Sequence, residues 1–170
     1  MVRSQEFSAA TAAEQPFPLA LDDSAPEELL KAGKYDWVSD YAKQIVQSKF
    51  YAVGVGEIEI ALLAHSYWKT LSPDDTRYDQ PEVGDALRFG AQYPDEQCES
   101  PIVFPHEPWA PPDGSISFVL VLRIEEGKAR GLSYTPHSRW LYDWWTSPRI
   151  ALRKRASTRS LIEMCFRAPV

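Results

Sequence analysis

The sequence predicts a single α+β domain in which short helices pack on a mostly antiparallel, twisted sheet. In residues 83–91, apolar side chains recur at the three- and four-residue spacing that lines one face of a helix. Residues 56–65, GEIEIALLAH, alternate between polar and apolar and then become continuously apolar, as in a strand that enters the middle of a sheet. Residues 117–124, SFVLVLRI, form the most β-prone run of the chain.

Length and charge indicate one domain with an N-terminal leader and a basic C-terminal tail. The chain has 170 residues, of which 44% are hydrophobic, which is the size of one domain with its own core. We expect a mobile leader at 1–23, the domain at 24–155, and a basic tail at 156–170 that forms a short helix or frays. Residues 149–170 carry six basic residues against one acidic residue, whereas the net charge of the chain is −6. Such a segment is either a solvated end or a contact for an acidic or nucleic-acid partner.

The cysteine pattern and the lack of long apolar runs predict a cytoplasmic protein. Cys98 and Cys165 are far apart and have no metal-ligand spacing, so we expect neither a disulfide framework nor a zinc site. No apolar run reaches the ~18 residues that span a bilayer. The N-terminal residues also lack the apolar core of a secretory signal, and no membrane association is expected.

Two helices are predicted in the N-terminal part of the domain. The first occupies residues 24–33, because Ser24 and Glu27 have capping-box spacing and Gly33 suits the residue after a helix. The second lies near residues 39–47, and the aromatic residues around it are expected to pack on the core.

The middle of the chain predicts an irregular crossover, a helix and a short strand. Residues 67–80 contain proline and aspartate breakers and leave room for at most one helical turn. The helix at 83–91 must end before Pro94, since proline disfavours the α region for the preceding residue. Residues 101–104 predict a short strand, and the four prolines of residues 105–114 predict a rigid loop.

Two hairpins are predicted after this loop. The strand at 117–124 is expected to be central, and Glu125 to Lys128 connect it to the next strand. WLYDWW at 140–145 and RIALRKR at 149–155 flank a Thr-Ser-Pro turn and predict the second hairpin.

The order of these segments resembles a known group of proteins. The motifs YDWV at 35–38 and FGAQYP at 89–94 resemble those of small uncharacterised bacterial proteins over roughly residues 27–154. That group is similar to the C-type-lectin-like fold, which is shared by the formylglycine-generating-enzyme superfamily and by the variable proteins of diversity-generating retroelements. The resemblance implies a C-type-lectin-like arrangement. Two departures are a shortened or missing first long helix between Ser66 and Gln80 and a segment after Lys154 without a counterpart.

The chemistry of those families is not expected in this chain. Calcium-binding lectins use a Glu-Pro-Asn or Gln-Pro-Asp turn and a Trp-Asn-Asp strand, whereas this chain has EPW at 107–109 and YDW at 142–144. Formylglycine-generating enzymes use reactive cysteines, and the sequence around Cys98 and Cys165 does not indicate an activated thiol. We therefore expect no catalytic residue, no metal and no cofactor.

The sequence favours a binding or interaction module that recognises a protein or another ligand through an aromatic surface. In a strand at 140–145, Trp140, Tyr142 and Trp144 share one face, so bulky aromatic residues lie on both faces and one set should be exposed. The proline-rich loop adds Trp109. The predicted site consists of four aromatic residues and two polar residues that set orientation: Trp109, Trp140, Tyr142, Trp144, Arg139 and Asp143.

Three alternatives stay open. The aromatic residues can instead close the core. They can also stack on single-stranded nucleic acid while Arg149, Arg153, Lys154 and Arg155 contact phosphates, although the acidic remainder disfavours this. The third alternative is a small enzyme of unknown chemistry. The three histidines are more than thirty residues apart and predict no zinc triad, while His106 and Glu107 are adjacent and usually point apart in an extended segment.

Overall fold

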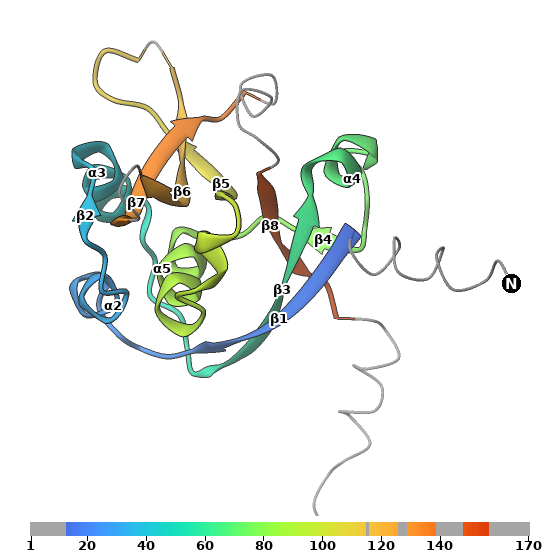
Figure 1. The fold of residues 1–170 in the computed structure, drawn as a ribbon, viewed down its shortest axis with the longest axis horizontal. Helices are drawn as coiled ribbons and strands as arrows, with labels where there is room; N and C mark the ends of the chain where they lie inside the picture. Colours follow the sequence, from blue (N-terminus) through green and yellow to red (C-terminus); the bar gives the residue numbers. More distant parts are fainter. Residues whose placement is uncertain (1–12, 115, 126–128, 139–147, 157–170) are drawn as a thin grey trace, which may run out of the picture.

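The computed structural model describes residues 13–114, 116–125, 129–138 and 148–156. These residues form one α+β domain with a mostly antiparallel sheet of eight strands, which confirms the predicted class. The strand order is β1-β3-β8-β5-β6-β7-β2, and β4 pairs with the end of β8 (Figure 1).

The elements have the following bounds. The helices are α2 (Pro26–Ala32), α3 (Asp40–Lys49), α4 (His65–Thr70) and α5 (Val83–Gln92), and a 3-10 turn spans Glu96–Cys98. The strands are β1 (Glu14–Leu21), β2 (Trp37–Val38), β3 (Gly56–Ala64), β4 (Tyr78–Asp79), β5 (Ile102–Trp109), β6 (Phe118–Glu125), β7 (Ala129–Pro136) and β8 (Arg149–Lys154). None of the helices in these described ranges is long and apolar enough to cross a membrane.

The two faces of the sheet carry cores of different size. Helices α2, α3 and α5 pack on one face and form the larger core with inward-facing strand residues (Figure 1). The other face carries smaller clusters against which Trp68 of α4 packs. Because successive side chains of a strand point to opposite faces, Ile60 and Leu62 of β3 join the larger core, whereas Ala61 and Leu63 join a smaller one.

Helix α5 is the central helix of the larger core. Leu87 and Phe89 are fully buried, as the apolar spacing of this segment predicts. At the N-terminal end, the Asp85 carboxylate accepts a hydrogen bond from the Glu82 backbone N–H at 2.8 Å. At the other end, the Tyr93 backbone N–H still donates to the Phe89 carbonyl, but Tyr93 itself has left the helical conformation.

Most of the predicted elements are confirmed with small shifts. The helices expected at 24–33 and 39–47 are α2 and α3, and the strand expected at 56–65 is β3 between β1 and β8. The expected central strand and hairpin are β6 and β7, which pair antiparallel. The crossover at 67–80 contains most of α4, which begins at His65, and the two-residue strand β4.

The predicted leader at 1–23 is wrong for its second half. Strand β1 pairs antiparallel with β3 along its whole length, from Glu14 opposite Leu63 to Leu21 opposite Gly56. Leu19 is fully buried. Phe17, Leu19 and Leu21 alternate along this strand with Pro16 and Pro18, which signal a loop in the sequence but are tolerated in an edge strand.

The predicted proline loop after residue 104 is also wrong in part. Strand β5 continues through Pro105 and Pro108 to Trp109, and its register with β6 shifts between Phe104 and Trp109. Such a bulge leaves backbone groups unpaired, and prolines are tolerated there because they lack an N–H.

The predicted hairpin between 140–145 and 149–155 is not seen at β8. Strand β8 pairs antiparallel with β3, parallel with β5 and antiparallel with β4, so other strands lie along it. The first half of the predicted hairpin lies outside the described residues.

Candidate functional site

At least four hollows on the described surface are lined by residues from separate elements, and two of them are candidate sites. The Lys49–Glu107 hollow has a volume of about 240 Å³ and lies where the end of α3, the β4–α5 connection and β5 meet. The α2–α3 groove has a volume of about 610 Å³ and lies between those two helices. Neither is lined by Trp109, the one described residue of the site that the sequence predicts.

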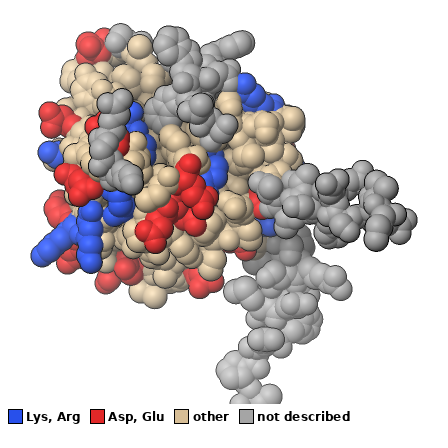
Figure 2. All heavy atoms as spheres, in the orientation of Figure 1, with Lys and Arg blue, Asp and Glu red and all other residues tan. Residues whose placement is uncertain are grey.

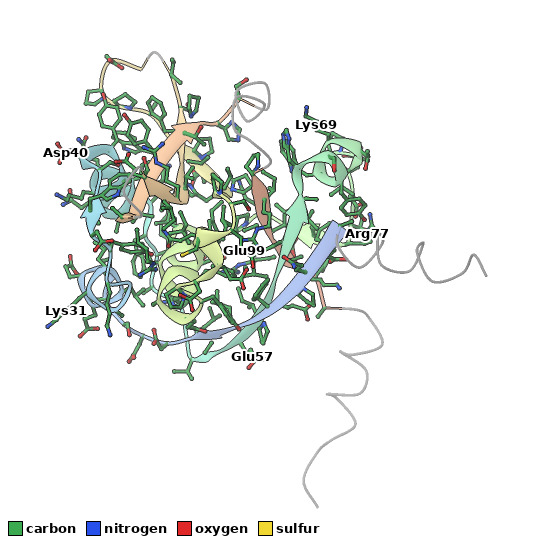
Figure 3. The ribbon with its side chains drawn as sticks, in the orientation of Figure 1. Lys31, Asp40, Glu57, Lys69, Arg77 and Glu99 are labelled. Atoms are coloured by element: carbon green, nitrogen blue, oxygen red, sulfur yellow. The ribbon has the colours of Figure 1, made fainter. Side chains whose placement is uncertain are left out.

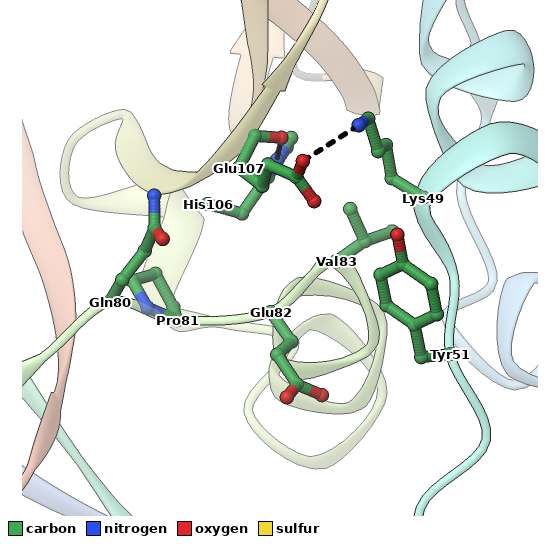
Figure 4. A pocket seen from close by; sticks show the side chains of 8 residues that line it. All are labelled: Lys49, Tyr51, Gln80, Pro81, Glu82, Val83, His106 and Glu107. Atoms are coloured by element: carbon green, nitrogen blue, oxygen red, sulfur yellow. Dashed lines mark hydrogen bonds and ion pairs between the residues drawn. The ribbon is translucent and has the colours of Figure 1, made fainter.

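Three chain segments line the Lys49–Glu107 hollow (Figure 4): the residues are Lys49, Tyr51, Gln80, Pro81, Glu82, Val83, His106 and Glu107. Helix α3 ends after Lys49, because Phe50 is already extended, and this leaves the Tyr51 side chain at the rim with 53% of its surface exposed. Pro81 and Val83 are buried and form the apolar part of the lining.

His106 holds β5 against β6 behind this hollow. Its ring is buried, and Nε2 accepts a hydrogen bond from the Leu120 backbone N–H at 3.0 Å. Nδ1 lies 2.7 Å from the Glu107 carbonyl oxygen, so the neutral ring carries its proton on Nδ1 and donates it there. Burial lowers the pKa of His106 to about 4. Both ring nitrogens are therefore hydrogen-bonded to backbone groups at the bulge.

A single ion pair closes one side of the hollow. Lys49 Nζ lies 3.1 Å from Glu107 Oε1, and the two side chains are 22% and 61% exposed. In Figure 4 the Glu107 carboxylate lies beside Lys49, the Gln80 amide lies at the far edge of the hollow, and the Glu82 carboxylate points away. Glu82 Oε2 lies 3.5 Å from an Arg153 guanidinium nitrogen instead.

The α2–α3 groove has an apolar floor and a polar rim. Its floor consists of Pro26, Leu30, Val38, Val46 and Phe50, of which only Val46 is fully buried. Its rim consists of Glu27 and Lys31 on α2 and of Lys43 and Gln47 on α3. Each rim pair has the four-residue spacing that places two side chains on one helix face.

The structure tests only one of the six predicted site residues. Trp109 is 9% exposed, and its ring packs against Tyr41 with 5.6 Å between centroids. It therefore belongs to the core, because the bulge continues β5 to this residue instead of leaving it on a loop. The other five residues lie outside the described ranges: Arg139, Trp140, Tyr142, Asp143 and Trp144.

The four cations of the nucleic-acid alternative are already paired with carboxylates. Arg149 pairs with Glu96, Arg153 with Asp85, Lys154 with Glu14 and Glu59, and Arg155 with Asp79. Hydrogen bonding to Asp85 raises the pKa of Arg153, and hydrogen bonding to Arg155 lowers the pKa of Asp79. A phosphate group must compete with these carboxylates.

No group of three or more histidine, cysteine, aspartate or glutamate side chains is arranged to hold a metal ion within the described ranges. Cys98 is a free, exposed cysteine in the 3-10 turn. Comparison of the chain with protein-family models, curated proteins and solved structures finds no match in any of the three.

Sequence reasoning missed both hollows for different reasons. The Lys49–Glu107 hollow joins residues that are 58 positions apart in the numbering, and no local pattern connects them. The groove offered a signal, since apolar residues at four-residue spacing in two short helices predict a shared apolar surface. That signal could not show that the surface stays partly open.

Proposed function

We propose that this protein is a non-enzymatic interaction module that binds an amphipathic helix of a protein partner in the α2–α3 groove. The partner helix is apolar on one face and carries acidic residues beside that face. The observation that carries the proposal is a groove whose apolar floor is partly exposed between lysines on its two walls.

The apolar floor supplies the affinity. Leu30 and Phe50 pack against the larger core with one side and remain partly exposed with the other. Exposed apolar side chains that are grouped and surrounded by polar residues are typical of interaction sites. A groove between two helices receives a third helix through apolar residues one turn apart. The volume of about 610 Å³ is large enough for several such side chains.

The rim supplies the charge preference. Lys31 and Lys43 lie on opposite walls, against the single carboxylate of Glu27. Lys43 lies 3.8 Å from Asp40, whose side chain is 94% exposed, and such a solvated pair is weak. Figure 3 shows Lys31 and Asp40 on the same side of the molecule, and in Figure 2 blue and red side chains alternate along that side. Although the net charge of the chain is −6, the rim of the groove carries two lysines and one carboxylate. The groove therefore favours a partner with acidic residues.

The test is selection from a displayed library of helical peptides of about four turns. Enriched peptides should carry apolar residues one turn apart, flanked by Asp or Glu. Measured by fluorescence anisotropy, the variants Leu30→Gln and Lys43→Glu should each bind the selected peptides about tenfold or more weakly.

The matched control is Lys34→Glu, which makes the same change of charge close to α2 but outside the groove lining. It should change the affinity about twofold or less at physiological salt. Thermal unfolding of each variant checks that the fold is retained. Enriched peptides that bind wild type and both groove variants equally well, or a library without enrichment, refute the proposed function.

The aromatic surface at Trp140, Tyr142 and Trp144, the C-type-lectin-like arrangement and a cytoplasmic location also remain proposals. The lectin-like arrangement has the support of the single α+β domain. An exposed, free Cys98 fits a reducing compartment.

A further inference from the structure

The Lys49–Glu107 hollow offers both charges of an ion pair to a ligand. Lys49 comes from the last residue of α3, and Glu107 comes from β5, so the pair bridges two rigid elements across an opening. Glu107 keeps more than half of its surface exposed, whereas Lys49 is mostly covered. A ligand can therefore reach the carboxylate directly, and the ammonium group through the opening.

The ion pair favours a ligand that carries both charges. A purely cationic ligand that takes Glu107 leaves the partly buried Lys49 ammonium without its partner, and a purely anionic ligand leaves Glu107 without its own. Each loss opposes binding, because an unpaired charge in a partly desolvated site is unfavourable. A zwitterion gives each group a new partner of the same charge as the one that it loses.

Neighbouring polar groups line the same hollow. The Gln80 amide lies at the edge farther from Lys49, beyond the Glu107 carboxylate (Figure 4). The exposed Tyr51 side chain brings a hydroxyl donor for a carboxylate to the rim near Lys49. The Glu82 carboxylate is engaged with Arg153 and points away from the hollow.

Size and lining limit the rest of the ligand. A volume of about 240 Å³ corresponds to about eight times the liquid volume of one water molecule. It therefore admits a ligand of about eight or nine non-hydrogen atoms. The buried side chains of Pro81 and Val83 offer an apolar surface, which suits an aliphatic group.

We propose that the Lys49–Glu107 hollow binds a free aliphatic α-amino acid. Glu107 receives the α-ammonium group, Lys49 and Tyr51 receive the α-carboxylate, and the side chain lies on Pro81 and Val83. This site is separate from the α2–α3 groove and does not depend on the function proposed for it.

The test compares three probes of nearly equal shape by isothermal titration calorimetry. L-Leucine carries both charges, its α-hydroxy acid analogue L-leucic acid only the negative one, and L-leucinamide only the positive one. Leucine should bind, and each analogue should bind about tenfold or more weakly, as expected for the loss of a charged hydrogen bond. An analogue that binds as tightly as leucine, or no heat of binding with leucine at millimolar concentration, overturns the proposal.

Two variants assign the ends of the ligand. Glu107→Gln should weaken leucine binding about tenfold and abolish the preference for leucine over L-leucic acid. Lys49→Met should abolish the preference for leucine over leucinamide instead. The control Glu125→Gln removes an exposed carboxylate paired with Arg123 on β6 and should leave all three affinities unchanged. Circular dichroism confirms that the variants are folded, and equal selectivity in wild type and both hollow variants overturns the assignment.

Discussion

At the scale of single residues, His106 shows how a side chain can replace a missing backbone acceptor. The bulge in β5 interrupts the ladder with β6, and the imidazole accepts the Leu120 N–H in the gap. An adjacent His-Glu pair in a sequence raises the possibility of acid/base chemistry, yet here the ring bonds to two backbone groups. The sequence could not show this, because the partner at residue 120 is brought close only by the strand pairing.

The first prediction follows from that role. His106→Leu keeps much of the buried volume but leaves the Leu120 N–H without its acceptor. The free energy of unfolding should fall by about 1–3 kcal/mol, the cost of an unsatisfied buried group. Urea unfolding at neutral pH measures it. An unchanged midpoint and slope would mean that water or a relaxed strand satisfies this N–H.

The second prediction concerns the pH dependence of stability. The pKa of His106 is about 4 in the folded protein, against an ordinary value of 6.5. Between these values the unfolded chain binds a proton that the folded chain does not, so the free energy of unfolding rises with pH. The contribution is complete above pH ~6.5, is lost as the pH falls toward 4, and amounts to at most about 3 kcal/mol. The stability difference between wild type and His106→Leu should therefore shrink across this window in urea unfolding, and a constant difference contradicts the assignment.

At the scale of elements, the outer edge of β1 is closed by side chains of α5. The Gln92 amide bonds to both the N–H and the carbonyl of Ala20, at 3.0 and 2.9 Å, and the Tyr93 hydroxyl donates to the Pro18 carbonyl. Backbone groups of alternate residues face the same edge of a strand, so Pro16 and Pro18 lack an N–H on this same edge. No free donor remains from Pro16 to Ala20, and the edge is protected against pairing with another chain.

The third prediction tests this protection. Gln92→Leu exposes the Ala20 N–H and carbonyl at an open edge, and it should increase the dimeric or larger fraction in sedimentation velocity at high protein concentration. The additional change Ala20→Pro removes the donor without touching a bond to β3, and it should restore the behaviour of wild type. Self-association of the double variant equal to that of Gln92→Leu would show that the edge is not the contact.

The same elements mark what sequence patterns can predict. Helix α5 was predictable from its apolar spacing, strand β3 from its alternation and apolar run, and strand β6 from its β-prone residues, because burial in the core favours each of these patterns. Strand β1 and the second half of β5 were not, since their prolines signal a loop in sequence but occupy an edge and a bulge in the fold. Both errors arise from tertiary contacts that a local pattern does not contain.

At the scale of the whole molecule, ion pairs connect the last strand to the rest of the fold. Asp85 is fully buried in α5 and receives two hydrogen bonds from Arg153, at 2.6 and 2.8 Å. The sequence shows Asp85 only as a charge in an otherwise apolar helix face and shows the arginines of β8 only as a basic run. A buried carboxylate requires such a partner, and its pairing with Arg153 makes the basic run of β8 part of the packed structure.

The last prediction uses this pairing to test the nucleic-acid alternative. Because Arg149 and Arg155 are engaged with Glu96 and Asp79, phosphates should not find them available, and wild type should not shift a single-stranded oligonucleotide at physiological salt. The variant Asp79→Asn releases Arg155, whose side chain is 52% exposed, and it should bind more tightly than wild type with a steeper dependence on salt. Electrophoretic shift at two salt concentrations separates the outcomes. Strong binding by wild type would restore nucleic-acid recognition as a function of β8.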